Sequence, residues 1–368
     1  MPRLVILSVA AGAGHVRAGE ALAEAARERG WVVDHQDALA DAPRWFVRAY
    51  IDGYLALIER SPALWGCLFR STDDADPQAR GQRLRRWFEE HCLNRLVRRL
   101  EEDPPDAVIC THFLPAQVLA ARQATGRWPC PTWVSVTDYG VHALWRHPGL
   151  RYAVADAASA WNVREHLPQV PVEVTGIPIS RAFRNPPERT AARQRLGLAP
   201  AGPVLLLLGG GLGIGDLDQL AARLLALPQK PQVVVMSGRN EALRDRLLAL
   251  PGDGRLEIVP YTKEPEVPMA AADLAIGKSG GLTTAECLAL GLPLLAASPL
   301  PGQEERNASH LLEHGAGLLA FDAAGVLGRV SGLLDDPRRL ETLADNARRL
   351  GRPRAADDLL DALAADLP

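Results

Sequence analysis

The sequence predicts an α/β fold of two doubly wound, Rossmann-like domains that face a cleft. Three observations lead to this prediction. Short apolar runs of strand length alternate with helix-like runs along the chain. A glycine turn follows the first strand of each half, at 12–15 and at 209–215. The length of 368 residues fits about two domains.

The first half opens with an apolar strand, a tight glycine turn and a helix that stops at Gly30, and a second strand follows. This β-loop-α-β order is how a doubly wound sheet begins. Residues 44–100 are expected to form long helices. The strands of this half are expected at 4–9, 31–35, 107–110, 132–136, 152–155 and 172–174.

A break at Pro186-Pro187 is typical of a linker between domains. The predicted domains are therefore 1–185 and 186–345. A final helical stretch is expected at 338–367, and its C-terminal segment, 346–368, is expected to pack back on the first domain. The strands of the second half are expected at 204–208, 233–236, 256–259, 274–276 and 293–297.

The composition narrows the class of protein. A net charge of −3 argues against a general nucleic-acid binder. The five cysteines are scattered and form no CxxC pair, so neither a zinc site nor a disulfide framework is expected, and a reducing cytosol is the default. No apolar segment reaches the length that spans a membrane, and the N-terminal apolar run is too short for a signal peptide.

The stretch 277–286 combines a strand end, a glycine turn and a helix start. Backbone N–H groups and the helix dipole favour an anion at such a turn. We expect a phosphate there, a ribose at Glu286 three residues into the helix, and sugar hydroxyls at a later polar cluster. The candidate residues are Lys278, Ser279, Gly280, Gly281, Thr283, Glu286, Gln303, Glu304 and Asn307. This pattern predicts a nucleotide-sugar site.

His15 is the first candidate for catalysis, because it follows a strand at the expected mouth of the cleft and its ordinary pKa near 6.5 suits a general base. The alternative is a histidine that fixes the loop. Asp138 also ends an apolar strand; it could orient His15, bind the acceptor or act as the base, and a capping role is equally open. For His142 and His147, loop structure or acceptor contacts are favoured over a metal site.

Other glycines and one arginine are candidates for contacts with the donor. The turn at 209–213 resembles a phosphate cradle, although close packing of helix on strand would explain it equally. Arg239 ends another strand and could close the nucleotide pocket or form a surface ion pair. Asp216-Leu217-Asp218 matches a DxD metal pattern in spelling, but a helix start is favoured. The candidate residues are Gly12, Gly14, Gly210, Gly211 and Arg239.

Residues 44–99 combine aromatic and basic residues. Residues 80–99 hold seven arginines against Glu89 and Glu90. On amphipathic helices this mixture suits an anionic membrane surface; the alternative is a core-facing aromatic stripe with a solvated basic face. The aromatic residues are Trp45, Phe46, Tyr50, Tyr54, Trp65, Phe69, Trp87 and Phe88.

Together these motifs resemble the bacterial processive diacylglycerol glucosyltransferases and the monogalactosyldiacylglycerol synthases, which are relatives of the peptidoglycan transferase MurG. The resemblance covers residues 4–319. The residues that carry it lie at 12–16, 136–138, 175–179, 278–286 and 301–304, with Asn307.

The resemblance implies a GT-B fold and inverting, metal-independent transfer of glucose or galactose from a UDP-sugar to diacylglycerol or a similar lipid. No metal or other cofactor is expected. It also implies a cytoplasmic, peripheral enzyme on the inner face of the membrane, with His15 acting at the acceptor hydroxyl. Two departures are Ala10, where plant-type enzymes carry Asp, and Leu212, which leaves the donor sugar open. The alternatives are MurG-like GlcNAc transfer to a polyprenyl-linked acceptor, a UDP-GlcNAc 2-epimerase and a silent UDP-sugar-binding protein.

Overall fold

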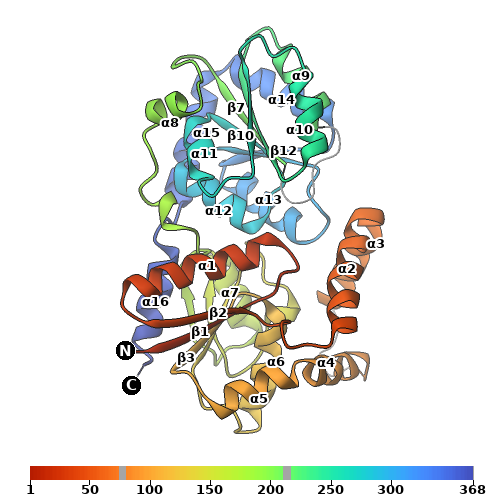
Figure 1. The fold of residues 1–368 in the computed structure, drawn as a ribbon, viewed down its shortest axis with the longest axis vertical. Coiled ribbons are helices and arrows are strands. Elements are labelled where there is room, and N and C mark those ends of the chain that lie inside the picture. Colours follow the sequence, from red (N-terminus) through yellow and green to blue (C-terminus); the bar gives the residue numbers. More distant parts are fainter. Residues whose placement is uncertain (74–79, 210–216, 368) are drawn as a thin grey trace. The chain divides into compact units, whose positions relative to one another are not determined.

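The computed structural model describes residues 1–73, 80–209 and 217–367. They form two compact units. The first consists of Met1–Arg181, Leu300–Gln303 and Arg354–Pro368, and the second of Ala182–Pro299 and Glu304–Pro353. Each unit has one six-stranded parallel sheet with helices on its faces (Figure 1). The predicted α/β class with two doubly wound sheets is confirmed.

The sheet of the first unit has the strand order β2-β1-β3-β4-β5-β6. The four inner strands are short and largely buried on both faces, as parallel strands usually are, whereas the edge strands β2 and β6 are partly exposed. Their bounds are β1 (Arg3–Ser8), β2 (Val32–Asp37), β3 (Ala107–Cys110), β4 (Thr132–Ser135), β5 (Arg151–Val154) and β6 (Val172–Val174).

Alternate residues of β1 enter two different hydrophobic cores, because successive side chains point to opposite faces of a sheet. Leu4 and Ile6 pack with α1 (Ala13–Glu28) and α16 (Ala355–Ala364). Val5 and Leu7 pack with helices on the other face. The remaining helical segments of this unit are α2 (Arg44–Arg60), α3 (Pro62–Asp73), α4 (Arg80–Cys92), α5 (Asn94–Glu102), α6 (Phe113–Ala124), η1 (Ala143–Trp145) and α7 (Ala157–His166), with η2 (Arg181–Phe183) at its boundary.

The final helical stretch differs from the prediction, because it consists of two helices. α15 (Pro337–Leu350) belongs to the second unit and α16 to the first. The break falls at Gly351, where a Cβ atom would come within 2.4 Å of the Leu288 carbonyl oxygen. α16 is tied to the first unit by Asp366, which accepts a hydrogen bond from the Trp133 indole at 3.0 Å and pairs with Arg151.

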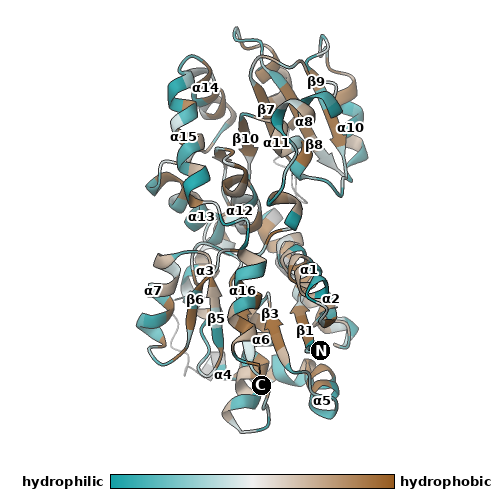
Figure 2. Cartoon of the chain, turned by 90° about the vertical axis from the view of Figure 1, so that its left-hand side faces the viewer, coloured by the Kyte–Doolittle hydropathy of each residue, from teal (hydrophilic) through white to brown (hydrophobic). Residues whose placement is uncertain are grey.

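The second unit repeats the architecture with the strand order β12-β11-β10-β7-β8-β9. The sequence prediction missed β12, a four-residue edge strand. In Figure 2 the strands are mostly brown and α15 is mostly teal, as expected of a buried sheet under amphipathic helices. The strands are β7 (Val204–Leu208), β8 (Gln232–Gly238), β9 (Leu256–Pro260), β10 (Leu274–Gly277), β11 (Leu294–Ala297) and β12 (Gly317–Ala320). The other helices are α8 (Arg189–Arg195), α9 (Leu217–Leu225), α10 (Glu241–Leu248), α11 (Glu266–Ala271), α12 (Gly281–Leu290), α13 (Gln303–Glu313) and α14 (Ala323–Leu334).

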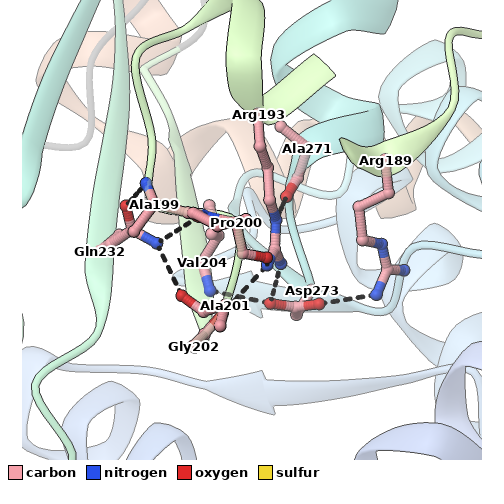
Figure 3. Close-up of polar contacts among 10 residues, drawn as sticks. All are labelled: Arg189, Arg193, Ala199, Pro200, Ala201, Gly202, Val204, Gln232, Ala271 and Asp273. Carbon is pink, nitrogen blue, oxygen red and sulfur yellow. Dashed lines mark hydrogen bonds and ion pairs between the residues drawn. The ribbon is translucent and has the colours of Figure 1, made fainter. Parts of the chain in front are cut away.

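Asp273 joins α8 to the sheet of the second unit (Figure 3). Its carboxylate accepts hydrogen bonds from the Val204 backbone N–H and from the guanidinium groups of Arg189 and Arg193, each at 2.8 Å. Arg193 also donates to the carbonyl oxygen of Ala271 at 3.0 Å. Because Asp273 directly precedes β10 and binds the first residue of β7, it fixes the starts of these two strands relative to each other.

Both strand orders contain a point where the direction of strand addition reverses. In the first sheet β1 lies between β2 and β3, and in the second β7 lies between β8 and β10. In doubly wound sheets, ligands bind beyond the carboxyl ends of the strands at this reversal. The loops after β1, β3, β7 and β10 are therefore the places where a site is expected.

Candidate functional site

His15 lies just beyond β1, in the first turn of α1. The turn is formed by Gly12, whose φ of 151° is a conformation that side-chain-bearing residues rarely adopt. The Thr111 hydroxyl, beyond the end of the neighbouring strand β3, donates to the His15 carbonyl oxygen at 2.9 Å. Because β1 and β3 are neighbours in the first sheet, His15 lies beside the carboxyl end of β3.

The hydrogen bonds of the His15 ring define its tautomer. Nδ1 lies 2.9 Å from the Thr111 carbonyl oxygen, which can only accept, so Nδ1 carries the proton. The Thr137 hydroxyl also lies 2.9 Å from Nδ1. Nε2 therefore bears the lone pair, which is the state that a general base requires.

Burial lowers the pKa of His15 from 6.5 to about 4, and the hydrogen bond with Thr111 opposes part of that shift. Removal from water disfavours the charged imidazolium. The ring is therefore neutral at neutral pH, and its Nε2 stays available to accept a proton.

The sequence prediction missed His112, which follows β3 and caps α6. Its ring lies edge-on to that of His15, with the centroids 4.7 Å apart. Burial is the main cause that lowers the pKa of His112 well below 6.5, and the nearby His15 adds to it. Unlike His15, His112 follows no glycine turn that would mark it in the sequence. Only the pairing of β1 with β3 reveals that the two histidines are neighbours.

A cavity of about 260 Å³ opens beside the two histidines, within the first unit. Its wall is largely aromatic and aliphatic. The apolar lining residues are Ala11, Tyr50, Trp65, Leu68, Phe69, Phe113, Leu144 and Trp145. Its polar lining residues include His15, Thr72, Arg85, Glu89, His112, Asp138, His142 and Gln303. An apolar cavity with a few polar groups is the usual form of a small-molecule site.

The structure brings the two predicted catalytic residues together, because both His15 and Asp138 line this cavity. The orienting role considered for Asp138 is filled by other groups: the Thr111 carbonyl and the Thr137 hydroxyl hold His15 Nδ1. His142 lies in the cavity wall and fixes a loop, since its Nε2 lies 2.9 Å from the Phe69 carbonyl oxygen. His147 is held by the Leu144 carbonyl oxygen and serves loop structure.

Arg85 is not available for a membrane surface, the interpretation that the sequence favoured, and it is not part of a solvated basic face, the alternative. Its guanidinium donates to both carboxylate oxygens of the buried Glu89 at 2.9 Å. Gln117 donates to the same carboxylate at 2.7 Å. Because Arg85 and Glu89 line the cavity, this ion pair forms a polar part of its wall.

In the second unit, the predicted phosphate turn connects β10 to the N-terminus of α12. Gly280 is the residue before the helix, and a Cβ there would meet no atom within 4 Å, so the approach to the turn is open. Gly281 and Glu286 are buried, whereas Lys278 and Thr283 are half-buried. The structure thus supplies a helix N-terminus, the element that binds anions in many nucleotide sites.

Two predicted ligand side chains have partners within the protein. The Ser279 hydroxyl donates to the Glu304 carbonyl oxygen at 2.7 Å, and the Asn307 amide donates to the Ser279 carbonyl oxygen at 2.9 Å. Both side chains are fully buried. They hold the start of α13 against the turn, which leaves the backbone of the turn as the group that can face an anion.

The remaining candidates are dispersed. Gln303 belongs to the segment Leu300–Gln303 of the first unit and lines its cavity, whereas Glu304 is buried in the second unit. Arg239 is exposed and its guanidinium lies 4.3 Å from the centre of the Tyr261 ring. Gly14 is half-buried in α1. Gly210, Gly211, Leu212 and Asp216 lie outside the described residues.

Among residues 1–73, 80–209 and 217–367, no three histidine, cysteine or acidic side chains gather as a metal site would require. Within the same ranges, no helix is both long and apolar enough to cross a membrane.

Two family models match the chain. The monogalactosyldiacylglycerol synthase model matches residues 15–179, and the glycosyltransferase family 28 C-terminal domain model matches residues 204–358. The chain is 28% identical over 370 aligned positions to a processive diacylglycerol beta-glucosyltransferase of Bacillus cereus strain AH187, covering 99% of this chain and 94% of the relative.

The fold is similar to that of MurG from Acinetobacter baumannii, with a TM-score of 0.66 at 18% identity over 99% of both chains. It is also similar to a UDP-GlcNAc 2-epimerase from Neisseria meningitidis solved with UDP-GlcNAc, with a TM-score of 0.58 at 15% identity, covering 99% of this chain and 100% of the epimerase.

The two parallel sheets and these matches define a glycosyltransferase with a GT-B fold. The chain carries a monogalactosyldiacylglycerol synthase domain and a glycosyltransferase family 28 C-terminal domain, and it is similar to the processive diacylglycerol glucosyltransferases, as its motifs predicted.

Proposed function

We propose that the protein transfers glucose or galactose from a UDP-sugar to diacylglycerol or a similar lipid alcohol, with inversion and without a metal ion. The observation that carries this proposal is the largely apolar cavity that is lined by a neutral histidine with a free lone pair. The relative from Bacillus cereus, named for a diacylglycerol glucosyltransferase, supports the choice of acceptor.

The cavity supports a lipid acceptor whose head enters while its chains stay outside. At about 260 Å³ it lies below the range of roughly 300–1,000 Å³ of sites that enclose a whole drug-sized ligand. Its aromatic lining residues suit glyceride carbons, and its polar lining residues suit a hydroxyl. The acyl chains would then remain in the lipid phase.

The N-terminus of α12 supports a diphosphate donor, because backbone N–H groups and the helix dipole stabilise the negative charge that develops on the leaving UDP. The two family models match different parts of the proposed site. The monogalactosyldiacylglycerol synthase model covers most of the first unit, which holds the cavity, and the family 28 C-terminal model covers α12. The relative aligned over nearly the whole chain is a glucosyltransferase, which favours glucose over galactose.

The reaction we propose is a single displacement. The acceptor oxygen attacks the anomeric carbon from the face opposite UDP, a new carbon–oxygen bond forms, and the bond to the diphosphate breaks. The hydroxyl proton passes to His15 Nε2, and UDP leaves with the electron pair. Asp138, in the same cavity, is the alternative proton acceptor.

The test is to incubate the protein with diacylglycerol vesicles and each UDP-sugar in turn, with and without EDTA, and to identify the products by mass. We expect a hexosyl-diacylglycerol whose yield EDTA leaves unchanged, because no step uses a metal. Loss of product in EDTA that manganese restores would contradict the mechanism.

The other candidates give different products in the same assay. When a polyprenyl-linked acceptor is added to the vesicles, a GlcNAc-polyprenyl product would favour MurG-like transfer. Epimerised UDP-GlcNAc without lipid would favour an epimerase. UDP-sugar binding without any product would favour a silent binding protein. The structural similarity to MurG and to an epimerase shows the shared fold alone.

We further propose that α2 and α4 bind an anionic membrane surface on the cytoplasmic side. Trp45, Leu84 and Trp87 are 56%, 66% and 62% exposed, and the Trp45 ring contacts the exposed Phe88 at 5.5 Å. Arg83 is exposed beside them. The other aromatic residues of this region face the cavity or the core: Phe46, Tyr50, Trp65 and Phe69, while the Tyr54 side chain lies outside the described residues.

Replacing Leu84 and Trp87 with serine should weaken binding to phosphatidylglycerol vesicles by about a hundredfold or more, since each large apolar side chain buried in lipid contributes about 1.5–3 kcal/mol. Sedimentation at low and high salt measures the effect. Trp161→Ser is the matched control, because Trp161 is 72% exposed but lies on α7. Equal losses in both variants would contradict the assignment of α4.

A further inference from the structure

His112 is held as a hydrogen-bond donor toward the cavity. Its Nδ1 accepts the Leu114 backbone N–H at 3.1 Å and thereby caps α6. A ring nitrogen that accepts from an N–H cannot itself carry a proton, so the proton of the neutral ring is on Nε2. The ring is 3% exposed and lines the cavity.

His15 and His112 therefore present opposite hydrogen-bonding groups from neighbouring positions in the lining of the cavity. His15 Nδ1–H is committed to Thr111, which leaves a lone pair on Nε2, whereas His112 offers an N–H. The two rings are in edge contact at 4.7 Å. Within the described parts of the chain, no oxygen or nitrogen accepts from His112 Nε2, so a ligand oxygen would satisfy it.

We propose that His112 is a specificity contact that recognises a second oxygen of the acceptor, on the carbon next to the one that bears the reacting hydroxyl. This inference rests on the proposed lipid glycosyltransferase function. Its substrate class is an alcohol with an ether, ester or hydroxyl oxygen on the neighbouring carbon, as in a glyceride. A simple long-chain alcohol offers the hydroxyl for His15 but nothing for His112.

The Phe113 and Trp145 rings fix the His112 ring in this orientation. Phe113 lies against it with the centroids 4.2 Å apart, and Trp145 lies at 6.3 Å. The donor is therefore preorganised, and a bound acceptor does not have to order it. A buried donor left unpaired by the wrong acceptor costs free energy, which is how such a site discriminates between ligands.

The test uses two acceptors that differ in one atom: a long-chain glycol monoether and the alcohol of equal length in which a methylene group replaces the ether oxygen. Both are presented in the same detergent micelles with the UDP-sugar. We expect the wild type to prefer the ether, in kcat/KM, by about three- to tenfold, the value of one hydrogen bond to a neutral group.

His112→Ser keeps an oxygen that can cap α6 and removes the N–H, so the preference ratio should fall toward one. His112→Asn keeps both a capping oxygen and an N–H donor, and it should restore part of the ratio. A merely structural role for His112 would lower both rates together and leave the ratio at its wild-type value, which would overturn the inference.

The wild-type preference tests the inference without any folding risk, because equal rates with the two acceptors would overturn it directly. Transfer to the alcohol and the ether at equal rates leaves the proposed function standing. Transfer to neither acceptor, nor to diacylglycerol, would instead overturn the proposed function and this inference with it.

Discussion

Replacing His15 with alanine is expected to lower kcat by about 10²–10⁴-fold, the usual contribution of a positioned general base. UDP affinity should stay nearly unchanged, because His15 belongs to the first unit and the proposed diphosphate turn to the second. Turnover of the labelled UDP-sugar and calorimetric titration with UDP measure the two quantities. An unchanged rate would remove His15 from the mechanism.

The pH profile of the wild type provides a second readout of the same residue. Burial places the pKa of His15 at about 4, so the ring stays deprotonated and active well below 6.5. We therefore expect kcat/KM to remain flat from neutral pH down through pH 6 and to fall only as pH approaches 4. A fall centred near 6.5 would contradict the buried, neutral histidine.

Two variants separate the candidate bases. Thr137→Val removes only the hydroxyl beside Nδ1, and the Thr111 carbonyl still holds the tautomer, so a loss smaller than that of His15→Ala is expected. Asp138→Asn keeps the shape of the side chain and removes its charge. A loss as large as that of His15→Ala, with the acid limb of the profile moved, would assign the base to Asp138.

Replacing Arg193 with alanine is expected to destabilise the second unit by about 3–5 kcal/mol, the cost of breaking a buried ion pair by removing one partner. The Arg193 side chain is 6% exposed, and it also donates to the carbonyl oxygens of Ala271, Pro200 and Gly202. The variant leaves those acceptors and Asp273 without this partner.

Arg189→Ala is the matched control, because Arg189 pairs with the other oxygen of the same carboxylate but is 53% exposed. Exposed ion pairs contribute about 0–1 kcal/mol, so this variant should be close to the wild type. Urea unfolding followed by circular dichroism measures both. All eight tryptophans lie at positions 31–161, so their fluorescence reports the first unit, and its transition should move less. Equal stability of the two variants would contradict the role of the buried pair.

The fold was largely predictable because parallel strands are buried on both faces and appear in the sequence as unbroken apolar runs. The runs at 204–208 and 274–276 became β7 and β10. β12, a four-residue strand that pairs with β11 at the sheet edge, was not among the predicted strands. Residues 44–100 were predicted as long helices, and the structure divides them into α2, α3, α4 and α5.

The candidate site was predictable only where a motif marks it. The glycine turns marked His15 and the start of α12. His112 has no such mark, because its position beside His15 follows from the pairing of β1 with β3, and the order of strands cannot be deduced from spacing. The internal roles of Ser279 and Asn307 were also hidden. A buried turn must satisfy its own carbonyl groups, and the side chains nearest to it are used for that purpose.

The placement of α16 has a consequence for the order in which the chain folds during synthesis. Leu359, Leu360 and Leu363 complete the hydrophobic core under α1, yet they are synthesised after all the strands of their own sheet. The strands β7–β12, which make up the entire second sheet, are all synthesised before them. Although the strands of the first unit are made first, its core is therefore closed only after the second sheet has been synthesised. A nascent chain holds the apolar surface under α1 exposed until α16 has emerged from the ribosome.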